Sequence, residues 1–129
     1  MKEEKIMKLI EELKDQNSKI PILVEGNRDI KALRNLGFTG KILKINEGLT
    51  LRDVAENIAG TYREIIIFMD WDRKGNMLEK AMLTYLQYYS VTCNIEFKRK
   101  IAYYSKRDIR CVEELYHYVL QITEKIKKG

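Results

Sequence analysis

Two acidic residues, separated by one tryptophan, stand where a hydrophobic run of the chain ends. Residues 65–69 are apolar, and Asp70, Trp71 and Asp72 follow them directly. A buried strand that ends in this way puts its carboxylates at the carboxyl edge of a sheet, where open α/β folds hold their sites. Two carboxylates held close together repel each other unless a proton or a cation lies between them. Because all the donors are oxygens, the pair favours a hard divalent ion such as Mg²⁺.

A third acid closes an earlier apolar run. Residues 22–24 are followed by Glu25 and Gly26, just as a glycine comes soon after the two aspartates. If the two runs form neighbouring strands, Glu25, Asp70 and Asp72 meet at one edge of the sheet. A glycine beside each acid allows a close backbone approach or an unusual turn. The three carboxylates therefore predict a Mg²⁺ site for phosphoryl or nucleotidyl transfer.

The same acids also have purely structural uses. A carboxylate at the end of a strand often caps the helix that follows, or pairs with a nearby arginine. Asp72 in particular is placed to cap a helix that begins near Asn76, or to pair with Arg73. The joint pattern of an acid and a glycine after two separate strands favours the functional interpretation.

Cations accompany these acids. Arg28, Arg73 and Lys74 lie in the same predicted loops and are placed to hold phosphate oxygens. The net charge of +5 suits a polyanionic partner such as nucleic acid. No apolar stretch approaches the roughly 20 residues that a membrane span needs, so no membrane partner is expected.

Much of the basic excess lies in residues 98–110, whose only acid is Asp108. The cations of this segment are Lys98, Arg99, Lys100, Lys106, Arg107 and Arg110. Nucleic-acid binding is one explanation, with residues 98–100 contacting phosphates. The other is an exposed edge strand that its lysines protect from aggregation. Tyr103 and Tyr104 lie within this basic segment. They are the one aromatic pair of the chain that we would test for base stacking.

Helices and strands alternate along the predicted chain. Strands are expected at residues 20–24, 41–46 and 64–69, and residues 95–97 and 101–104 give signals for one further strand or two. Helices are expected at residues 3–16, 29–36, 51–59, 76–89 and 109–126. This alternation predicts an α/β three-layer sandwich, with a parallel-rich sheet of about four strands and helices on both faces. Residues 1–18 are expected as an N-terminal amphipathic helix in front of a domain at 19–129.

Composition limits the classes of protein to which this chain could belong. A chain of 129 residues is long enough for one domain with a substantial core. Its first five residues mix acids with bases, unlike a signal peptide. Cys93 and Cys111 lack Cys-x-x-Cys spacing, so they predict free thiols and neither a disulfide framework nor a zinc site. We therefore expect a cytoplasmic protein.

The acidic pattern resembles the Toprim domain, which topoisomerases, primases and the small nuclease that matures 5S rRNA share. That family has a glutamate after its first strand and Asp-x-Asp after its third. The matching residues here are Val24-Glu25-Gly26 with Asp29, and then Met69-Asp70-Trp71-Asp72-Arg73-Lys74-Gly75. The resemblance covers roughly residues 20–104. It implies that Glu25 acts as a general acid or base and that Asp70 and Asp72 bind Mg²⁺.

The resemblance also implies an activity, namely Mg²⁺-dependent cleavage of RNA or DNA by a small Toprim nuclease. A module that binds nucleic acid or a protein partner without catalysis is the alternative, because a fold does not fix an activity. Asn27 stands where several of these families have a lysine. The sequence leaves open the choice between RNA and DNA, the number of metal ions and the oligomeric state.

Two other α/β families place acids in a similar way. A response-regulator receiver has a phosphoacceptor aspartate after its third strand, but it needs adjacent acids after its first, where Gly26 follows Glu25. A haloacid-dehalogenase phosphatase needs a small hydroxyl or β-branched residue two positions after its second aspartate. Lys74 occupies that position here. Both families therefore fit this sequence less well than the Toprim family does.

Overall fold

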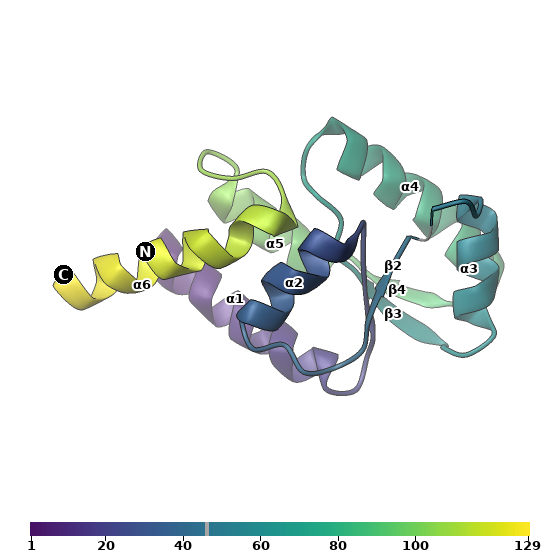
Figure 1. The fold of residues 1–129 in the computed structure, drawn as a ribbon, viewed down its shortest axis with the longest axis horizontal. Coiled ribbons are helices and arrows are strands. Elements are labelled where there is room, and N and C mark those ends of the chain that lie inside the picture. The colour runs from purple at the N-terminus through teal and green to yellow at the C-terminus, as the bar shows by residue number, and fades with distance from the viewer. Residues whose placement is uncertain (46) are drawn as a thin grey trace.

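A computed structural model describes residues 1–45 and 47–129 and shows a sheet between two layers of helices (Figure 1). The sheet has four strands in the order β2-β1-β3-β4, and every neighbouring pair is parallel. The strands are β1 (Ile22–Val24), β2 (Ile42–Lys44), β3 (Glu64–Ile67) and β4 (Thr92–Asn94). The α/β fold with a parallel sheet is thereby confirmed, and β1 and β3 lie side by side at its centre.

The helices divide between the two faces of the sheet. They are α1 (Lys2–Asn17), α2 (Asn27–Asn35), α3 (Leu51–Ala59), α4 (Arg73–Tyr88), α5 (Glu96–Ser105) and α6 (Leu115–Lys128), with a short 3-10 helix η1 (Val112–Glu114) before α6. Apolar side chains of α3 and α4 form one core with the sheet. Those of α1, α2, α5 and α6 form the other core on the opposite face. This is the three-layer sandwich that the sequence predicts.

The segment that runs through β3 towards the acids is buried on both faces. Ile66 and Phe68 pack in the core under α1, α2 and α6, whereas Ile65, Ile67 and Met69 pack under α3 and α4. All five side chains are fully buried. A continuous apolar run is what a central strand of a parallel sheet requires. Burial ends at Asp70, which is the first half-exposed residue after this run.

The N-terminal helix belongs to the packed structure. Ile6, Leu9, Ile10 and Leu13 of α1 are buried in the same core as β1, β3 and α6. The helix also lies against α5 along its length. The amphipathic stripe that the sequence predicts at residues 3–16 is therefore covered by the rest of the chain.

The prediction of strands at residues 95–97 and 101–104 is wrong. The fourth strand lies earlier, at Thr92–Asn94, and residues 96–105 form the helix α5. Phe97, Ile101 and Tyr104 recur at helical spacing and pack towards α1. Short apolar runs fit both periods, and here the tertiary contact with α1 decides the outcome. The basic residues 98–100 thus lie on a helix and on no edge strand.

Three further helix boundaries differ from prediction. The last helix, α6, begins at Leu115 and not at residue 109, since residues 109–111 are not helical and η1 precedes it. α4 begins three residues early, at Arg73, because Asp72 caps it. α2 begins at Asn27, so Asp29 lies within its first turn and Gly26 takes the N-cap position. By contrast, α3 has the predicted bounds, and Thr50 caps it by accepting a hydrogen bond from the backbone N–H of Asp53 at 3.1 Å. The predicted strand at 41–46 is confirmed at 42–44, and residue 46 lies outside the described residues.

None of the helices in the described parts of the chain combines the length and the apolar character that crossing a bilayer needs.

Candidate metal and nucleic-acid site

Glu25 and Asp70 meet at the carboxyl edge of the sheet. They follow β1 and β3, which pair in parallel, with Ile22 opposite Ile66. The backbone N–H of Asp70 donates a hydrogen bond of 3.0 Å to Oε2 of Glu25, across 45 residues of sequence. Two carboxylates from separate strands are therefore held together, as the sequence predicts from the strand order.

The start of η1 holds Asp70 from the other side. The backbone N–H of Val112 donates a 2.8 Å hydrogen bond to Oδ1 of Asp70. Partial burial, together with the neighbouring carboxylate of Glu25, raises the pKa of Asp70 to about 7, although the bond from Val112 opposes this shift. A carboxyl group whose pKa is raised in this way gains from any cation placed beside it.

Asp29 is a further acid near this pair. It is buried in the first turn of α2, where its Oδ2 accepts a 3.1 Å hydrogen bond from the backbone N–H of Gly26. Burial and the charge of Asp70 raise the pKa of Asp29 to about 6. In the sequence Asp29 stands at the start of a predicted helix and forms part of the family pattern. No local signal shows that its charge acts on Asp70.

Asp72 lies beside the pair but is engaged in a structural contact. Its Oδ1 accepts a 2.7 Å hydrogen bond from the backbone N–H of Gly75 and so caps α4. Its charge also contributes to the raised pKa of Asp70. The structure thus gives Asp72 the capping contact that the sequence offers as an alternative, while keeping its charge near the site.

The two glycines near the acids differ in what they do. A Cβ atom at Gly75 would lie 2.1 Å from the carbonyl oxygen of Asp70, so only glycine fits there. A Cβ atom at Gly26 would meet nothing within 4 Å. Gly75 therefore allows α4 to begin close to the backbone of Asp70, whereas no close approach explains Gly26.

The oxygen donors of Glu25 and Asp70 suit Mg²⁺. Within residues 1–45 and 47–129 no three acidic, histidine or cysteine side chains are arranged to hold a metal ion. The described hydrogen bonds engage one oxygen of each carboxylate, and Oε1 of Glu25 and Oδ2 of Asp70 are left for a cation. Proteins commonly hold Mg²⁺ by one or two carboxylates, and water and phosphate oxygens complete its shell. The pair fits an ion that binds together with a phosphate.

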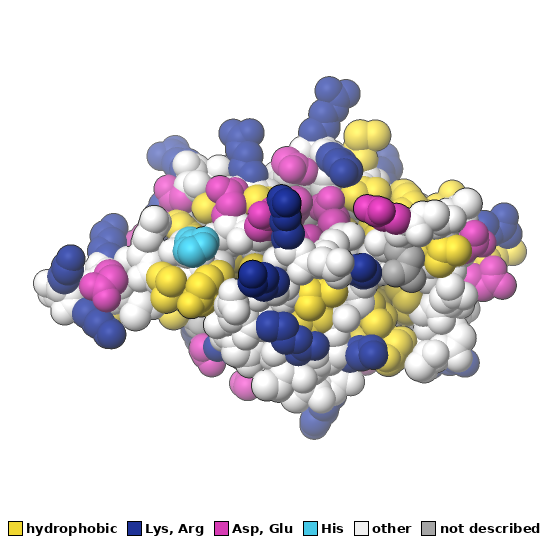
Figure 2. Space-filling model, in the orientation of Figure 1, with side chains coloured by type: hydrophobic (Ala, Val, Ile, Leu, Met, Phe, Trp, Pro, Cys, Tyr) yellow, Lys and Arg dark blue, Asp and Glu magenta, His cyan; other side chains and the backbone are white. Residues whose placement is uncertain are grey.

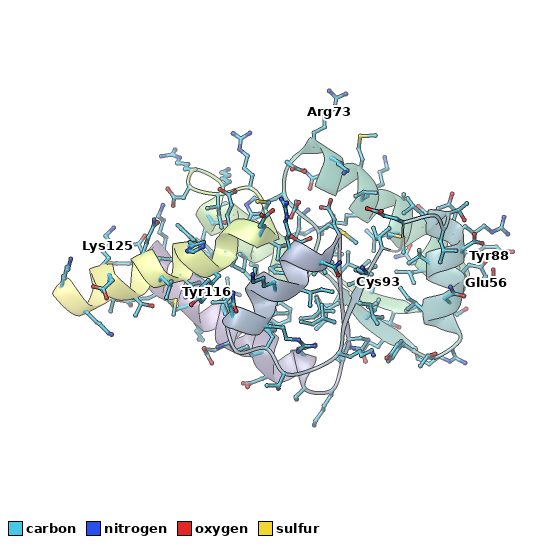
Figure 3. The ribbon with its side chains drawn as sticks, viewed as in Figure 1. Glu56, Arg73, Tyr88, Cys93, Tyr116 and Lys125 are labelled. Carbon is cyan, nitrogen blue, oxygen red and sulfur yellow. The ribbon has the colours of Figure 1, made fainter. Side chains whose placement is uncertain are left out.

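Three of the predicted phosphate-binding cations are exposed around this edge. Arg28 lies in the first turn of α2, with its Nη1 3.8 Å from Oε1 of Glu113. Arg73 and Lys74 lie in the first turn of α4. Figure 3 shows Arg73 extending from the start of that helix, away from the sheet. Figure 2 shows acidic side chains grouped between α6 and α4, with Lys and Arg side chains around them.

The other predicted cations divide into a buried residue and two exposed ones. Lys98 is buried, with its Nζ 3.0 Å from Oε1 of Glu79, and it donates a hydrogen bond to Oδ1 of Asn76. The contact with Glu79 is an ion pair without hydrogen-bond geometry, so that oxygen has no hydrogen-bond partner among the described residues. Lys98 thus joins α5 to α4 and offers no charge to solvent. Arg99 and Lys100 are exposed on α5.

Comparison with known proteins places this site in a family. The model of the Toprim domain matches residues 20–102. The chain belongs to the Toprim domain family, and this membership connects it with metal-dependent functions that involve nucleic acid. The Asp-x-Asp of Asp70 and Asp72 and the preceding Glu25 lie within the matched residues.

Small relatives of similar length are known. A UPF0292 protein of Thermococcus gammatolerans is 38% identical over 118 residues, which are 92% of this chain and 86% of the relative. A UPF0292 protein of Methanocaldococcus jannaschii is 34% identical and covers 90% of this chain and 91% of its own. The solved structure of a putative protein from Aquifex aeolicus has a TM-score of 0.70 at 26% identity and covers 84% of this chain and 95% of its own.

Proposed function

We propose that this protein is a small Mg²⁺-dependent nuclease that cleaves phosphodiester bonds in RNA or DNA. The observation that carries the proposal is the contact between Asp70 and Glu25, which holds two carboxylates from neighbouring strands side by side. One oxygen of each carboxylate is left for a metal ion, and the edge of the sheet where they lie is the usual site of open α/β folds.

Each acid has a proposed role. Asp70 would hold Mg²⁺, and Glu25 would either help to hold the ion or take or give the proton of the attacking or leaving oxygen. Asp72 adds negative charge beside the ion and is the third candidate ligand. A bound Mg²⁺ ion polarises the phosphate and stabilises negative charge on the leaving oxygen.

The exposed cations complete the proposed substrate site. Arg28, Arg73 and Lys74 hold the phosphates nearest to the acids. The planar guanidinium of arginine and the ammonium group of lysine on its flexible stem both bind phosphate oxygens. Arg99 and Lys100 are proposed as outer contacts to the nucleic acid. Lys98 contributes by fixing α5 against α4, since its ammonium group is buried. A cytoplasmic location, with Cys93 and Cys111 as free thiols, is part of the same proposal.

The test is cleavage of a panel of structured RNAs and of single-stranded and duplex DNAs, with Mg²⁺ and with chelator. Wild-type protein is expected to cut at least one substrate only in the presence of the metal. Glu25→Gln is expected to abolish cleavage while leaving the circular dichroism spectrum unchanged. Unchanged cleavage by this variant would remove Glu25 from the mechanism.

A non-catalytic module that binds nucleic acid or a protein partner is the second candidate. It is favoured by the capping contact of Asp72 and by the absence of a preformed three-ligand group within the described residues. Salt-sensitive nucleic-acid binding without cleavage in Mg²⁺ or Mn²⁺ would support it over the nuclease.

A further inference from the structure

The basic loop of residues 106–110 is fastened to the segment that carries Asp70. The backbone N–H of Trp71 donates a 2.9 Å hydrogen bond to the carbonyl of Arg110. The indole Nε1 of Trp71 donates a 2.8 Å bond to the carbonyl of Ile109. Immediately after the loop, Val112 donates to the carboxylate of Asp70. These bonds fix the loop, which we call the 106–110 loop, directly beside the proposed metal ligands.

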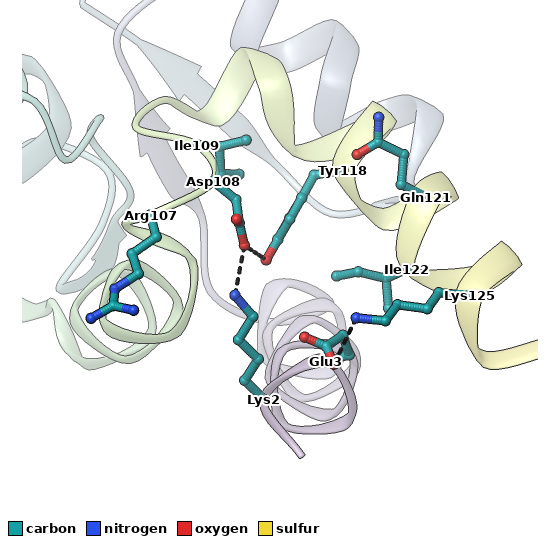
Figure 4. A pocket seen from close by; sticks show the side chains of 9 residues that line it. All are labelled: Lys2, Glu3, Arg107, Asp108, Ile109, Tyr118, Gln121, Ile122 and Lys125. Carbon is teal, nitrogen blue, oxygen red and sulfur yellow. Dashed lines mark hydrogen bonds and ion pairs between the residues drawn. The ribbon is translucent and has the colours of Figure 1, made fainter. Parts of the chain in front are cut away.

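Three cations of this loop face solvent. Lys106, Arg107 and Arg110 are exposed, and within the described chain none of them forms an ion pair. The acid of the loop is already neutralised, because Oδ2 of Asp108 lies 2.8 Å from Nζ of Lys2. Figure 4 shows Lys2 and the hydroxyl of Tyr118 converging on Asp108, while Arg107 extends away from them. The positive charge of the loop is therefore available to an external anion.

The loop borders a hollow that is large enough for a nucleotide. The hollow has a volume of about 690 Å³, and Trp71, Lys106, Arg107 and Arg110 line it together with Asp108, Ile109 and Glu114. Glu114 is engaged locally, since its Oε1 accepts hydrogen bonds from Sγ of Cys111 at 3.1 Å and from the backbone N–H of Arg110 at 3.3 Å. Binding sites for small molecules have volumes in the same range.

A second hollow shares part of its wall with the first. It has a volume of about 330 Å³, shares Lys106 and Arg107 with the first, and adds Lys2, Tyr103 and Tyr104. Tyr103 is 68% exposed, and Nζ of Lys106 lies 5.6 Å from the centre of its ring. The side chains of Lys106 and Arg107 therefore border both hollows, with Tyr103 lining one and Trp71, the neighbour of Asp70 in the chain, lining the other.

The exposed ring of Tyr103 and the half-buried ring of Trp71, beside unpaired cations, are suited to a single strand. Bases of an unpaired strand stack on aromatic side chains while basic groups follow the phosphates. A duplex keeps its bases stacked inside and presents mainly phosphates and groove edges. Trp71 forms part of the wall of the first hollow, and Tyr103 forms part of the wall of the second.

We propose that an unpaired segment of RNA or DNA binds along the 106–110 loop. Its phosphates contact Lys106, Arg107 and Arg110, and its bases stack on Trp71 and Tyr103. The strand is thereby led to the carboxylates of Glu25 and Asp70. The choice of ligand rests on the proposed function, but the binding itself requires neither metal nor cleavage.

Trp71 is the only tryptophan of the chain, so its fluorescence reports this site directly. In chelator, a mixed-sequence single strand is expected to quench that emission with the same midpoint as an anisotropy titration. A duplex of the same sequence is expected to bind about tenfold more weakly. The double variant Arg107→Ala, Arg110→Ala is expected to bind the single strand about tenfold or more weakly and to reduce the salt slope by about 1.4.

A matched control removes the same charge elsewhere. Lys127→Ala, Lys128→Ala changes two exposed residues near the end of the chain, and it is expected to leave both affinity and quenching unchanged. Tyr103→Ala offers an independent probe, since its exposed ring is expected to contribute about fivefold or more to single-strand binding.

Several results would overturn the inference. Equal weakening by both double variants would mean that only net charge matters. Anisotropy without quenching would place the strand elsewhere, and preference for the duplex or no binding would remove the single-strand site. If quenching occurs as expected but Mg²⁺ produces no cleavage, the nuclease proposal fails and the binding site stands. Cleavage without quenching would support the nuclease proposal and rule out strand binding at Trp71.

Discussion

Two pairs of charged side chains join neighbouring elements of this protein, and they differ in sign. Lys98 and Glu79 carry opposite charges, lie 3.0 Å apart and are almost wholly excluded from water. Glu25 and Asp70 carry like charges and lie at the half-exposed edge of the sheet. In the first pair the two opposite charges neutralise each other. In the second pair, partial burial and the charge of Glu25 raise the pKa of Asp70, and a proton or a cation is needed to relieve the repulsion.

The opposite-charge pair provides the largest expected effect. Lys98→Met leaves the carboxylate of Glu79 buried without its partner, so we expect the free energy of unfolding to fall by about 3–5 kcal/mol. Urea denaturation followed by circular dichroism measures this loss. The double variant Lys98→Met, Glu79→Leu removes both charges and is expected to recover most of it. A single variant as stable as wild type would show that the pair is unimportant for stability.

The second-largest effect on stability is expected from the backbone at Gly75, beside the like-charge pair. Gly75→Ala puts a Cβ atom against the carbonyl of Asp70, so the start of α4 must shift, and we expect a loss of about 1–3 kcal/mol. Gly26→Ala is the matched control, because its new atom meets open space. We expect that control to lie within about 0.5 kcal/mol of wild type. Similar losses in both variants would contradict the close approach at Gly75.

Removal of one charge from the like-charge pair is expected to increase the free energy of unfolding. Asp70→Asn keeps an oxygen that can accept from Val112 and ends the repulsion with Glu25, so the metal-free protein should gain about 1 kcal/mol. Mg²⁺ should raise the melting temperature of the wild type, because a ligand that binds only the folded state stabilises it. It should leave the variant unchanged. Equal stabilisation of both proteins by Mg²⁺ would separate Asp70 from metal binding.

An exposed pair of opposite charges gives the smallest effect. The bonds from Lys2 and from the hydroxyl of Tyr118 lower the pKa of Asp108. A folded-state pKa below the unfolded value stabilises the protein at pH values above the unfolded pKa, and this contribution is lost as pH falls through the folded-state pKa. Asp108→Asn is therefore expected to melt slightly below wild type at neutral pH, and the two curves should converge in strong acid. A difference that persists in acid would point to lost packing.

The sequence predicts the like-charge pair better than the opposite-charge pair. Apolar runs followed by Glu25 and Asp70 are local patterns, and the parallel alternation of helix and strand places their ends at one edge. Lys98 and Glu79 lie on different helices, and nothing local shows that they meet. The helix at residues 96–105 was missed for the same reason, since contact with α1 decides between two periods that the local pattern allows.

The capping of α4 shows a different limit of prediction from sequence. The sequence allows Asp72 either to bind a metal ion or to cap a helix, and only the position of Gly75 beside Asp70 decides how the loop turns. The proximity of Asp29 to Asp70 likewise depends on where α2 begins, two residues before the predicted start. Helix boundaries are the least certain feature of a sequence reading, and here the site depends on them.

The bond from Val112 to Asp70 has a consequence for biosynthesis. A nascent chain that has emerged only as far as α5 already carries every acid of the site, but it lacks the donor that orients Asp70. The indole of Trp71 likewise finds its acceptor only in residue 109. The carboxylates therefore acquire their final arrangement only after residues 109–112 have been synthesised and have packed against Asp70 and Trp71.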